Sequence, residues 1–299
     1  MAVTLKTGDE TMKDYIKLAR FKHCIKNIFI LMPLFFGHRL FDLSADICCF
    51  FGFLAFTFLS SVIYIINDIN DVENDRRHPK KRMRPIASGK ISVKNGTIYA
   101  CVLGVLAIVC AFFACRQNPF SALFLVVYFA INFLYSFGLK NYPIVDVAIL
   151  ASGFLLRVLF GASVVDIKVS SWLYLTVLSL SFYLGLGKRR NELKRQSDSA
   201  RTVLKFYSYE FLDKMMYMFM AIALVFYSLW CADPLTVSAT SHSGIVWTVP
   251  VIILILMRYS YIVEGDSDGD PAEVVLHDVP LIILGAFYAV LITLLLYVK

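Results

Sequence analysis

Residues 47–75 read ICCFFGFLAFTFLSSVIYIINDINDVEND, an apolar run that ends in a group of amides and carboxylates. A helix needs about 20 mostly apolar residues to cross a bilayer, and residues 47–67 supply them. The run is continuously apolar rather than alternating, which favours a helix over a strand. The stretch therefore predicts a membrane-spanning helix with an acidic end.

The composition of the whole chain supports the same interpretation. Of its 299 residues, 59% are hydrophobic and only 17% are charged, and the mean hydropathy is +0.69. An average soluble domain is about 45–50% apolar and about 25% charged, so this chain has too little polar surface for a water-soluble globule. The same values exclude a disordered, collagen-like or disulfide-rich secreted chain. The prediction is an all-α, polytopic integral membrane protein.

Nine stretches qualify as spans, although the first is short and contains Pro33. They are residues 25–38, 47–67, 96–114, 118–137, 143–165, 171–187, 214–233, 245–263 and 279–298. The seven cysteines lie mostly in apolar runs without metal-ligand spacing, so we interpret them as reduced, small apolar residues. The first segment, about 25 residues long, is polar, so no cleavable signal peptide is expected.

The 29 Lys and Arg residues are unevenly distributed between the two sides of this arrangement. Most belong to the N-terminal segment, the loop after the second span or the loop after the sixth. Because cytoplasmic loops are enriched in Lys and Arg, we expect the N-terminus in the cytoplasm of a bacterial-type inner membrane and the C-terminus outside. The net charge of +7 is attributed to topology and lipid headgroups, not to nucleic acid.

Asn67, Asp71 and Asp75 are spaced four residues apart at the end of the second span. With about 3.6 residues per turn they share one helix face, drifting by about 40° per step. Carboxylates one turn apart repel one another, which is understandable if a divalent cation lies between them. Mg²⁺ prefers oxygen ligands and is usually held by one or two carboxylates together with substrate phosphates. Asp68 lies about 100° away, where it serves a second ion or the next shell of the first.

A basic loop containing Pro79 and Pro85 follows the acidic helix end. The prolines are expected to end the helix and to stiffen the loop. Lys81 and Arg84 are expected to bind phosphate oxygens. The alternative is a solvated loop of mixed charge, which does not account for acids at helical spacing directly before the basic residues.

Residues 67–89 fit the pattern NDxxDxxxDRxHPxKxxRPIASG, which resembles the first signature of the UbiA superfamily of intramembrane prenyltransferases. The resemblance implies nine transmembrane helices around a central cavity, an active site that faces the cytoplasm, and a diphosphate bound through Mg²⁺ at this motif. A single UbiA-like domain, residues 1–299, is expected, with residues 1–24 as a cytoplasmic, amphipathic N-terminal segment. The implied metal-site and catalytic residues are Asn67, Asp68, Asp71 and Asp75.

Five further segments resemble one branch of the superfamily, the polyprenyl-phosphate (decaprenyl-phosphate) phosphoribosyltransferases. They are residues 20–27, 135–146, 185–193, 258–259 and 271–278, and the LGKRRNEL sequence within the third points most directly to the branch. The resemblance implies that a 5-phosphoribosyl group passes from phosphoribosyl diphosphate (PRPP) to a polyprenyl phosphate, with Mg²⁺-assisted loss of diphosphate. The residues expected to contact the substrates are Lys22, Lys26, Lys81, Arg84, Tyr135, Lys140, Asp146, Arg157, Lys188, Arg189, Arg190, Glu192 and Arg258.

UbiA enzymes that prenylate aromatic rings usually carry a second Asp-rich motif in the loop after the sixth helix, and this chain lacks it. Residues 188–195, KRRNELKR, stand in its place. A cluster of cations suits a phosphate monoester, so this half of the site is assigned to the lipid phosphate or to a 5-phosphate. The alternative is a loop whose charge serves membrane orientation alone.

Polar residues inside or beside the predicted spans have two interpretations each. Asp146 and Arg157 are eleven residues apart, about 20° from the same helix face, and either line a cavity or form ion pairs with other helices. Tyr135 and Lys140 either frame the donor or anchor a helix end at the membrane interface. The acids within residues 264–270 predict a mobile acidic loop rather than a Ca²⁺ site.

Two other functions remain open as alternatives. The first is a UbiA-type prenyltransferase that moves an isoprenoid from its diphosphate to an aromatic or lipid acceptor, although the missing second Asp-rich motif counts against it. The second is a multi-pass transporter or lipid-phosphate carrier, which would not need metal-spaced residues at one helix end. Transporters often show inverted repeats, and the sequence contains no clear one. A homo-oligomer is compatible with the sequence.

Overall fold

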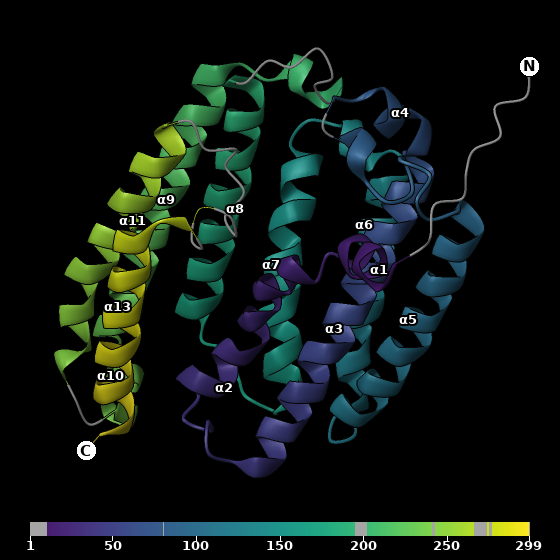
Figure 1. Ribbon diagram of the computed structural model, residues 1–299. Coiled ribbons are helices and arrows are strands. Elements are labelled where there is room, and N and C mark those ends of the chain that lie inside the picture. Colours follow the sequence, from purple (N-terminus) through teal and green to yellow (C-terminus); the bar gives the residue numbers. More distant parts are fainter. Residues whose placement is uncertain are drawn as a thin grey trace, which may run out of the picture. The chain divides into compact units, whose positions relative to one another are not determined.

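The computed structural model describes residues 11–79, 81–194, 202–240, 243–265, 274 and 277–298. Every regular element in these ranges is a helix (Figure 1), as the composition predicts. The chain forms two compact units. Unit 1 contains the described residues of Met1–Leu34, Leu40–Leu139 and Arg157–Ile167, and unit 2 contains those of Phe35–Arg39, Lys140–Leu156 and Lys168–Lys299.

Unit 1 is built around α3 (Leu43–Asn70), the helix predicted from the long apolar run. This helix packs along α5 (Val93–Ala114), and the two run side by side in Figure 1. The other elements of unit 1 are α1 (Met12–Ala19), η1 (Phe21–Leu31), the first residues of α2 (Met32–Phe36), α4 (Val72–Arg77), η2 (Lys81–Met83), η3 (Pro119–Ser121), α6 (Ala122–Ser136) and the C-terminal half of α7 (Val145–Val164).

The helix starts and one close approach in unit 1 follow directly from the local sequence. The Asp42 carboxylate caps α3 by accepting hydrogen bonds from two backbone N–H groups of its first turn, and the Ser92 hydroxyl caps α5 by accepting one, from Asn95. Gly161 of α7 lies against the backbone of η1, where a Cβ atom would be 2.0 Å from the Ile30 carbonyl oxygen. A side chain at this position would therefore force α7 and η1 apart.

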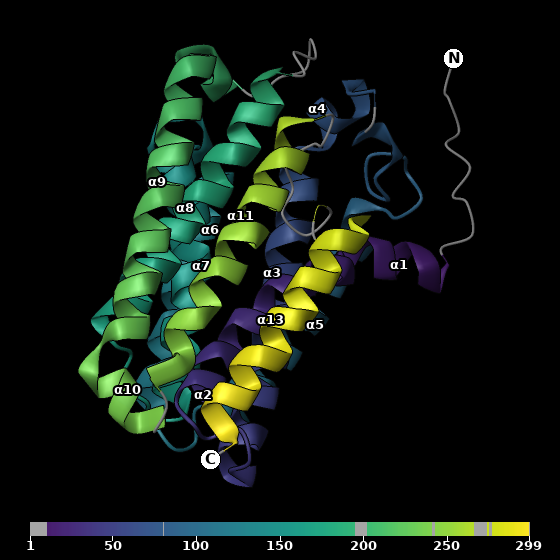
Figure 2. The same ribbon diagram turned by 90° about the vertical axis from the view of Figure 1, so that its left-hand side faces the viewer.

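Unit 2 is a group of long helices placed side by side in Figure 2, in which α8 packs on α9, α9 on α11, and α11 on α13. Ser208 caps the start of α9 and Asp278 caps the start of α13 through side-chain acceptors. The bounds are α8 (Ser171–Lys194), η5 (Thr202–Phe206), α9 (Tyr209–Ala232), α10 (Pro234–Thr240), η6 (Ser243–Thr248), α11 (Val249–Glu264) and α13 (Val279–Tyr297); the N-terminal half of α7 and η4 (Leu139–Asn141) adjoin them.

Seven helical segments of the described chain are long and apolar enough to cross a membrane, and they coincide with seven of the nine predicted spans. The stretch predicted at residues 25–38 is divided between η1 and the five-residue helix α2, which contains Pro33. The stretch predicted at 171–187 lies in α8, whose Ser, Thr and Tyr side chains and cationic end lower its hydropathy. The chain is thus an all-α, polytopic membrane protein, and nine spans remain a prediction.

Two local expectations about the motifs need correction. The helix with the acidic motif does not run on without a break, because α3 ends at Asn70 and Asp71 separates it from α4. The helical spacing nevertheless survives, since the Asp71 N–H donates to the Asn67 carbonyl at 2.9 Å and the Asp75 N–H to the Asp71 carbonyl at 2.8 Å. Residues 188–194 do not form a loop but the last two turns of α8.

Candidate active site

Arginine side chains cover the acidic motif of unit 1. The carboxylates of Asp68 and Asp75 are almost completely buried, with 2% and 4% of their side chains exposed. Arg84 Nη1 bridges them, donating to Asp75 Oδ2 at 2.6 Å and to Asp68 Oδ1 at 3.1 Å. Arg20 also donates to Asp68, and its guanidinium carbon lies 5.0 Å from the centre of the Tyr64 ring. The cluster therefore consists of two buried carboxylates paired with two partly exposed guanidinium groups.

The other predicted residues near this cluster lie on short elements of unit 1. Lys22 is exposed and Lys26 half-buried on η1, while half-buried Lys81 begins η2, which packs against α4. The Lys81 backbone N–H donates to His78 Nδ1 at 3.3 Å, so this side chain connects the end of α4 to the start of η2. Tyr135 is half-buried on the last turn of α6. These placements leave their expected roles in substrate binding as predictions.

Arg157 lies in a buried polar network. It donates to Asn27 Oδ1 at 2.7 Å, to Tyr128 OH at 3.0 Å and to Ser60 Oγ at 3.3 Å, which links α7 to η1, α6 and α3. The rings of Phe56 and Tyr128 also contact its guanidinium group, at 5.2 and 4.8 Å. These bonds satisfy the buried donors. They give Arg157 a structural role in unit 1.

Asp146, on the first turn of α7, belongs to a separate buried cluster in unit 2. Arg189 Nε donates to Asp146 Oδ2 at 2.5 Å, and neither side chain is exposed. Arg189 Nη1 also donates to Glu192, one turn further along α8, at 2.7 Å. The Tyr207 hydroxyl donates to Asp146 Oδ1 at 2.7 Å. Of the two interpretations of Asp146 left open by the sequence, the structure supports an ion pair with another helix.

The Tyr207 hydroxyl acts as a hydrogen-bond donor at neutral pH. Its burial, followed by its donation to the Asp146 carboxylate, raises the pKa of the Tyr207 hydroxyl to about 12. The phenol therefore stays protonated at neutral pH. It helps to hold the Asp146 carboxylate in place beside Arg189.

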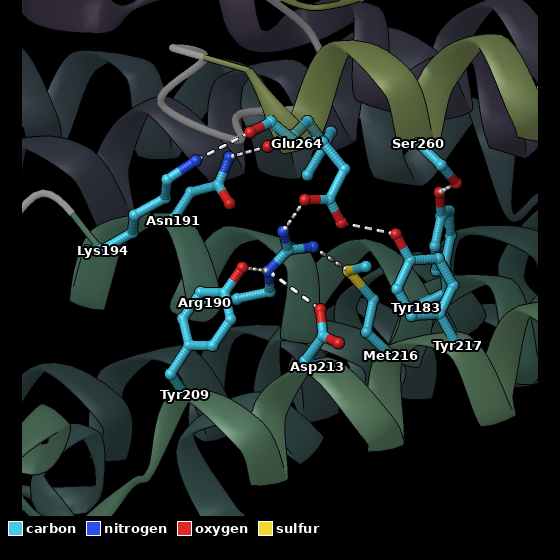
Figure 3. A network of polar contacts seen from close by, with 11 residues as sticks. Tyr183, Arg190, Asn191, Lys194, Tyr209, Asp213, Met216, Tyr217, Ser260 and Glu264 are labelled. Atoms are coloured by element: carbon cyan, nitrogen blue, oxygen red, sulfur yellow. Dashed lines mark hydrogen bonds and ion pairs between the residues drawn. The ribbon is translucent and has the colours of Figure 1, made fainter.

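Arg190 joins α8 to α9 and α11 in a second network of unit 2 (Figure 3). Its Nε donates to the Tyr209 hydroxyl at 3.0 Å and lies 3.2 Å from Asp213 Oδ1, and its Nη2 lies 2.7 Å from Glu264 Oε2. Tyr217 donates to the other oxygen of Glu264, while Asn191 and Lys194 donate to backbone carbonyls at the end of α11. The arginine itself is fully buried.

The cationic end of α8 is therefore largely neutralised within unit 2. Arg189 and Arg190 each lie beside two carboxylates, and neither arginine side chain is exposed. A bare cluster of positive charges was the reason to assign both to a phosphate, and the structure does not provide it. Lys188, which precedes them on α8, is half-buried.

Arg258 of α11 also pairs with a carboxylate. It donates from Nε and Nη2 to the two oxygens of Asp278, at 3.0 and 2.7 Å. This donation, with that from the Leu281 N–H, holds the pKa of the Asp278 carboxyl below its usual value. The pair links the end of α11 to the cap of α13. The acidic loop predicted around Asp266, Asp268 and Asp270 lies outside the described residues.

The UbiA prenyltransferase family model matches residues 29–277, well over half of the chain. The chain belongs to the UbiA prenyltransferase family. This membership makes it an enzyme of the transferase class, and it places the Asn67–Asp75 motif and the end of α8 within the matched region. The predicted family and fold class are confirmed.

Two relatives of this UbiA-family protein are both named decaprenyl-phosphate phosphoribosyltransferase. The one from Mycolicibacterium smegmatis is 32% identical, over 88% of this chain and 86% of the relative, and the one from Corynebacterium glutamicum is 34% identical, over 95% and 86%. A solved UbiA homologue from Archaeoglobus fulgidus, bound to GPP and Mg²⁺, superimposes with a TM-score of 0.71 at 20% identity, over 95% of this chain and 100% of the homologue. At this identity the solved structure supports the fold alone.

The sequence did not reveal several partners of the charged residues in the two units of this UbiA-family protein. Arg20 was part of the motif in residues 20–27 but received no role, although it contacts Asp68. Tyr207, Asp213 and Glu264 were not assigned to the arginines of α8. A fully buried arginine requires carboxylate partners somewhere in the chain, but the sequence does not show that Arg189 and Arg190 are buried. The sequence does not say which carboxylates these are.

Proposed function

We propose that the protein transfers a 5-phosphoribosyl group from PRPP to a polyprenyl phosphate of the decaprenyl-phosphate type. The acceptor oxygen forms a bond to C1′ of the ribose as the bond from C1′ to diphosphate breaks. The names of the two relatives support this choice of donor and acceptor. The structural observation behind it is the ion pair between Arg84 and buried Asp75, which puts a guanidinium group suited to phosphate beside a carboxylate suited to Mg²⁺.

The residues at the acidic motif fit a magnesium ion. Asn67, Asp71 and Asp75 offer oxygen atoms, and the backbone bonds between them keep the spacing of one helix turn. Asp75 is buried and already needs a cation to balance its charge, which Arg84 supplies here. Within the described residues no group of three or more Asp, Glu, His or Cys side chains forms a ready cation site, so the donor's phosphates would complete the ligand set. When bound, Mg²⁺ would neutralise charge on the departing diphosphate.

The protein's own residues have simple tasks in this proposal. Lys22, Lys26, Lys81 and Arg84 bind phosphate oxygens of PRPP and balance the negative charge that develops on the leaving group. The acceptor phosphate is already ionised, so no general base is required. The membrane-embedded position excludes water, which would otherwise compete as the acceptor. We also propose that this site faces the cytoplasm, because the basic segments lie on that side of the predicted topology.

In unit 2 we propose that Lys188 binds the acceptor phosphate, and the expected place of Lys140 beside the donor remains a prediction. The pair formed by Arg189 and Asp146 holds the last turns of α8 rigid, and Glu192 and Arg190 extend this support. Arg157 and Arg258 act on the substrate indirectly in this proposal, through the helices that they connect. A direct contact of Tyr135 with the donor remains a prediction. A single functional domain and a homo-oligomer remain predictions.

A second candidate function is the transfer of an isoprenoid from a prenyl diphosphate to an aromatic or lipid acceptor. Membership of the UbiA prenyltransferase family favours it. The absence of a second Asp-rich motif at residues 188–195 argues against it, because a metal-bound diphosphate held from two sides needs carboxylates on both.

The purified protein separates the two candidates directly. With labelled PRPP, a polyprenyl phosphate and Mg²⁺, we expect label to enter the lipid phase, and we expect none when Mg²⁺ is removed with a chelator. Each reaction is followed by extraction into organic solvent and chromatography of the lipid. Activity with a prenyl diphosphate and an aromatic acid, together with none from PRPP, would instead establish the second candidate.

Replacing Lys188 by alanine is expected to raise the KM for polyprenyl phosphate by about tenfold, because a charge-assisted phosphate contact is lost. The KM for PRPP should change little. The matched control is Lys194→Ala, which removes an exposed lysine from the same end of α8. Steady-state kinetics with each substrate varied in turn provide the measurement. An equal rise in both KM values would show that the acceptor contact has been assigned to the wrong residue.

A further inference from the structure

Asp68 has one more arginine partner than Asp75. It accepts from both Arg20 and Arg84, whereas Asp75 accepts from Arg84. With only 2% of its side chain exposed, it lies beneath the two guanidinium groups. Asp68 was left open between a second metal ion and the next shell of the first. These contacts favour a position for Asp68 in the shell behind the proposed metal ligands.

The two arginines above Asp68 differ from the buried arginines of unit 2. Arg20 and Arg84 are 23% and 28% exposed, whereas Arg189 and Arg190 have no exposed surface. Arg84 lies beside two carboxylates, as each unit 2 arginine does, but Arg20 pairs with Asp68 and shares it with Arg84. A guanidinium group that is anchored on one side and open on the other can accept an anionic ligand.

The charges of the cluster indicate which ligand this is. Arg20, Arg84, Asp68 and Asp75 carry two positive and two negative charges. A divalent cation taken up by Asp75 would make the Arg84 contact to Asp75 redundant and leave the cluster net positive. Both guanidinium groups would then stay held by Asp68, with their open sides available to phosphate oxygens.

We propose that Asp68 is a positioning residue and not a metal ligand, and that it orients Arg20 and Arg84 to bind phosphate oxygens of the donor. Arg20 thereby becomes a further donor-binding residue. Its position suits this task, because it joins α1 to η1 and its guanidinium group is also held against the Tyr64 ring. The inference rests on the proposed function only in taking a diphosphate donor to bind at this motif.

A double-mutant cycle in the purified protein tests whether Asp68 acts through Arg20. The probe is inorganic diphosphate, whose dissociation constant is measured by calorimetry at saturating Mg²⁺. Asp68→Asn and Arg20→Met are each expected to weaken binding by about tenfold, and the double variant by about tenfold as well, because the second change removes nothing further. A double variant weakened by about 100-fold would show independent roles and overturn the proposal.

Metal binding without any phosphate provides a second readout. Mn²⁺, followed by its electron paramagnetic resonance signal, is expected to bind Asp71→Asn at least about tenfold more weakly than the unaltered protein, because a ligand carboxylate is lost. The Asp68→Asn variant should change this affinity by less than about threefold, since it removes no ligand. Equal losses in the two variants would make Asp68 a metal ligand and refute the proposal.

Two controls guard against effects on folding. Arg76→Met removes an exposed arginine of the same segment, paired with Glu73 on the surface, and should leave diphosphate affinity unchanged. Arg20→Lys keeps the charge and provides a folded variant if Asp68→Asn proves unstable; it should bind diphosphate more weakly than the unaltered protein because the planar fork is lost. Unchanged diphosphate affinity in both Arg20 variants would contradict the proposal.

The probes also separate this inference from the proposed function. Inorganic diphosphate is the leaving group of PRPP and of prenyl diphosphates alike, so the cycle does not depend on which donor is used. A parallel titration with ribose 5-phosphate shows whether Arg20 reaches the sugar phosphate instead, and a loss with either probe supports its role. If PRPP is not a substrate but the cycle behaves as expected, the proposed function fails and the inference stands.

Discussion

Replacing Asp75 by asparagine is expected to lower the rate of transfer by at least about 100-fold while leaving a folded protein. The substitution keeps the shape of the side chain but removes the negative charge proposed to hold Mg²⁺. Asp75 is only 3% exposed and already balances a cation, Arg84, so its charge cannot be replaced by water. The measurement is the initial rate with saturating Mg²⁺, PRPP and polyprenyl phosphate.

The matched control for Asp75→Asn is Glu73→Gln. It removes one carboxylate from the same short helix, but Glu73 is 69% exposed and pairs with Arg76 at the surface. Exposed pairs of this kind contribute about 0–1 kcal/mol, so the control should retain nearly full activity. Normal turnover in Asp75→Asn, or an equal loss in Glu73→Gln, would remove the basis for a metal site at this helix end.

Replacing Arg189 by methionine is expected to destabilise the protein by about 3–5 kcal/mol, because the change leaves the carboxylate of Asp146 buried without its cation. Neither residue of the pair has exposed side-chain surface. Tyr207 alone cannot balance the charge, since it is a neutral donor. The free energy of unfolding, or the unfolding temperature in detergent, provides the measurement.

The double variant Arg189→Met with Asp146→Asn tests the cause of this loss. Removing the charge of the partner as well should restore much of the stability, because no uncompensated anion remains. The exposed lysine of the same helix end provides the control, and Lys194→Met should have little effect. An Arg189→Met variant of unaltered stability with weakened use of polyprenyl phosphate would support the phosphate-binding role assigned from the sequence.

Much of the fold follows from local sequence patterns. Seven of the nine predicted spans are helices of sufficient length and hydropathy, because spanning a bilayer depends on about 20 consecutive side chains. The first predicted span is less regular, since Pro33 lies in a short helix after a 3-10 segment. The acidic motif keeps its expected spacing across the break at Asp71, because the backbone bonds from Asn67 to Asp75 remain helical.

The partners of the charged residues follow from contacts far apart in the chain. In the sequence, Arg189 and Arg190 look like part of a phosphate-binding cluster. The fold places three carboxylates from three other helices beside them, those of Asp146, Asp213 and Glu264. Likewise, the sequence shows Asp68 only as one of four polar residues in a motif, and the structure adds its contacts with Arg20 and Arg84.

Hydropathy, proline and capping signals act over one or two helix turns, so reading along the chain was sufficient for the membrane class, most helices and the family-specific motifs. Whether a given charge is free to meet a ligand or already neutralised depends mostly on carboxylates tens of residues away. Burial increases the free-energy cost of leaving such a charge unpaired, because a charge removed from water needs a counter-charge. The packing of the helices decides which carboxylate each arginine meets. It leaves Arg20 and Arg84 partly exposed beside Asp68, and it buries Arg189 and Arg190 on α8.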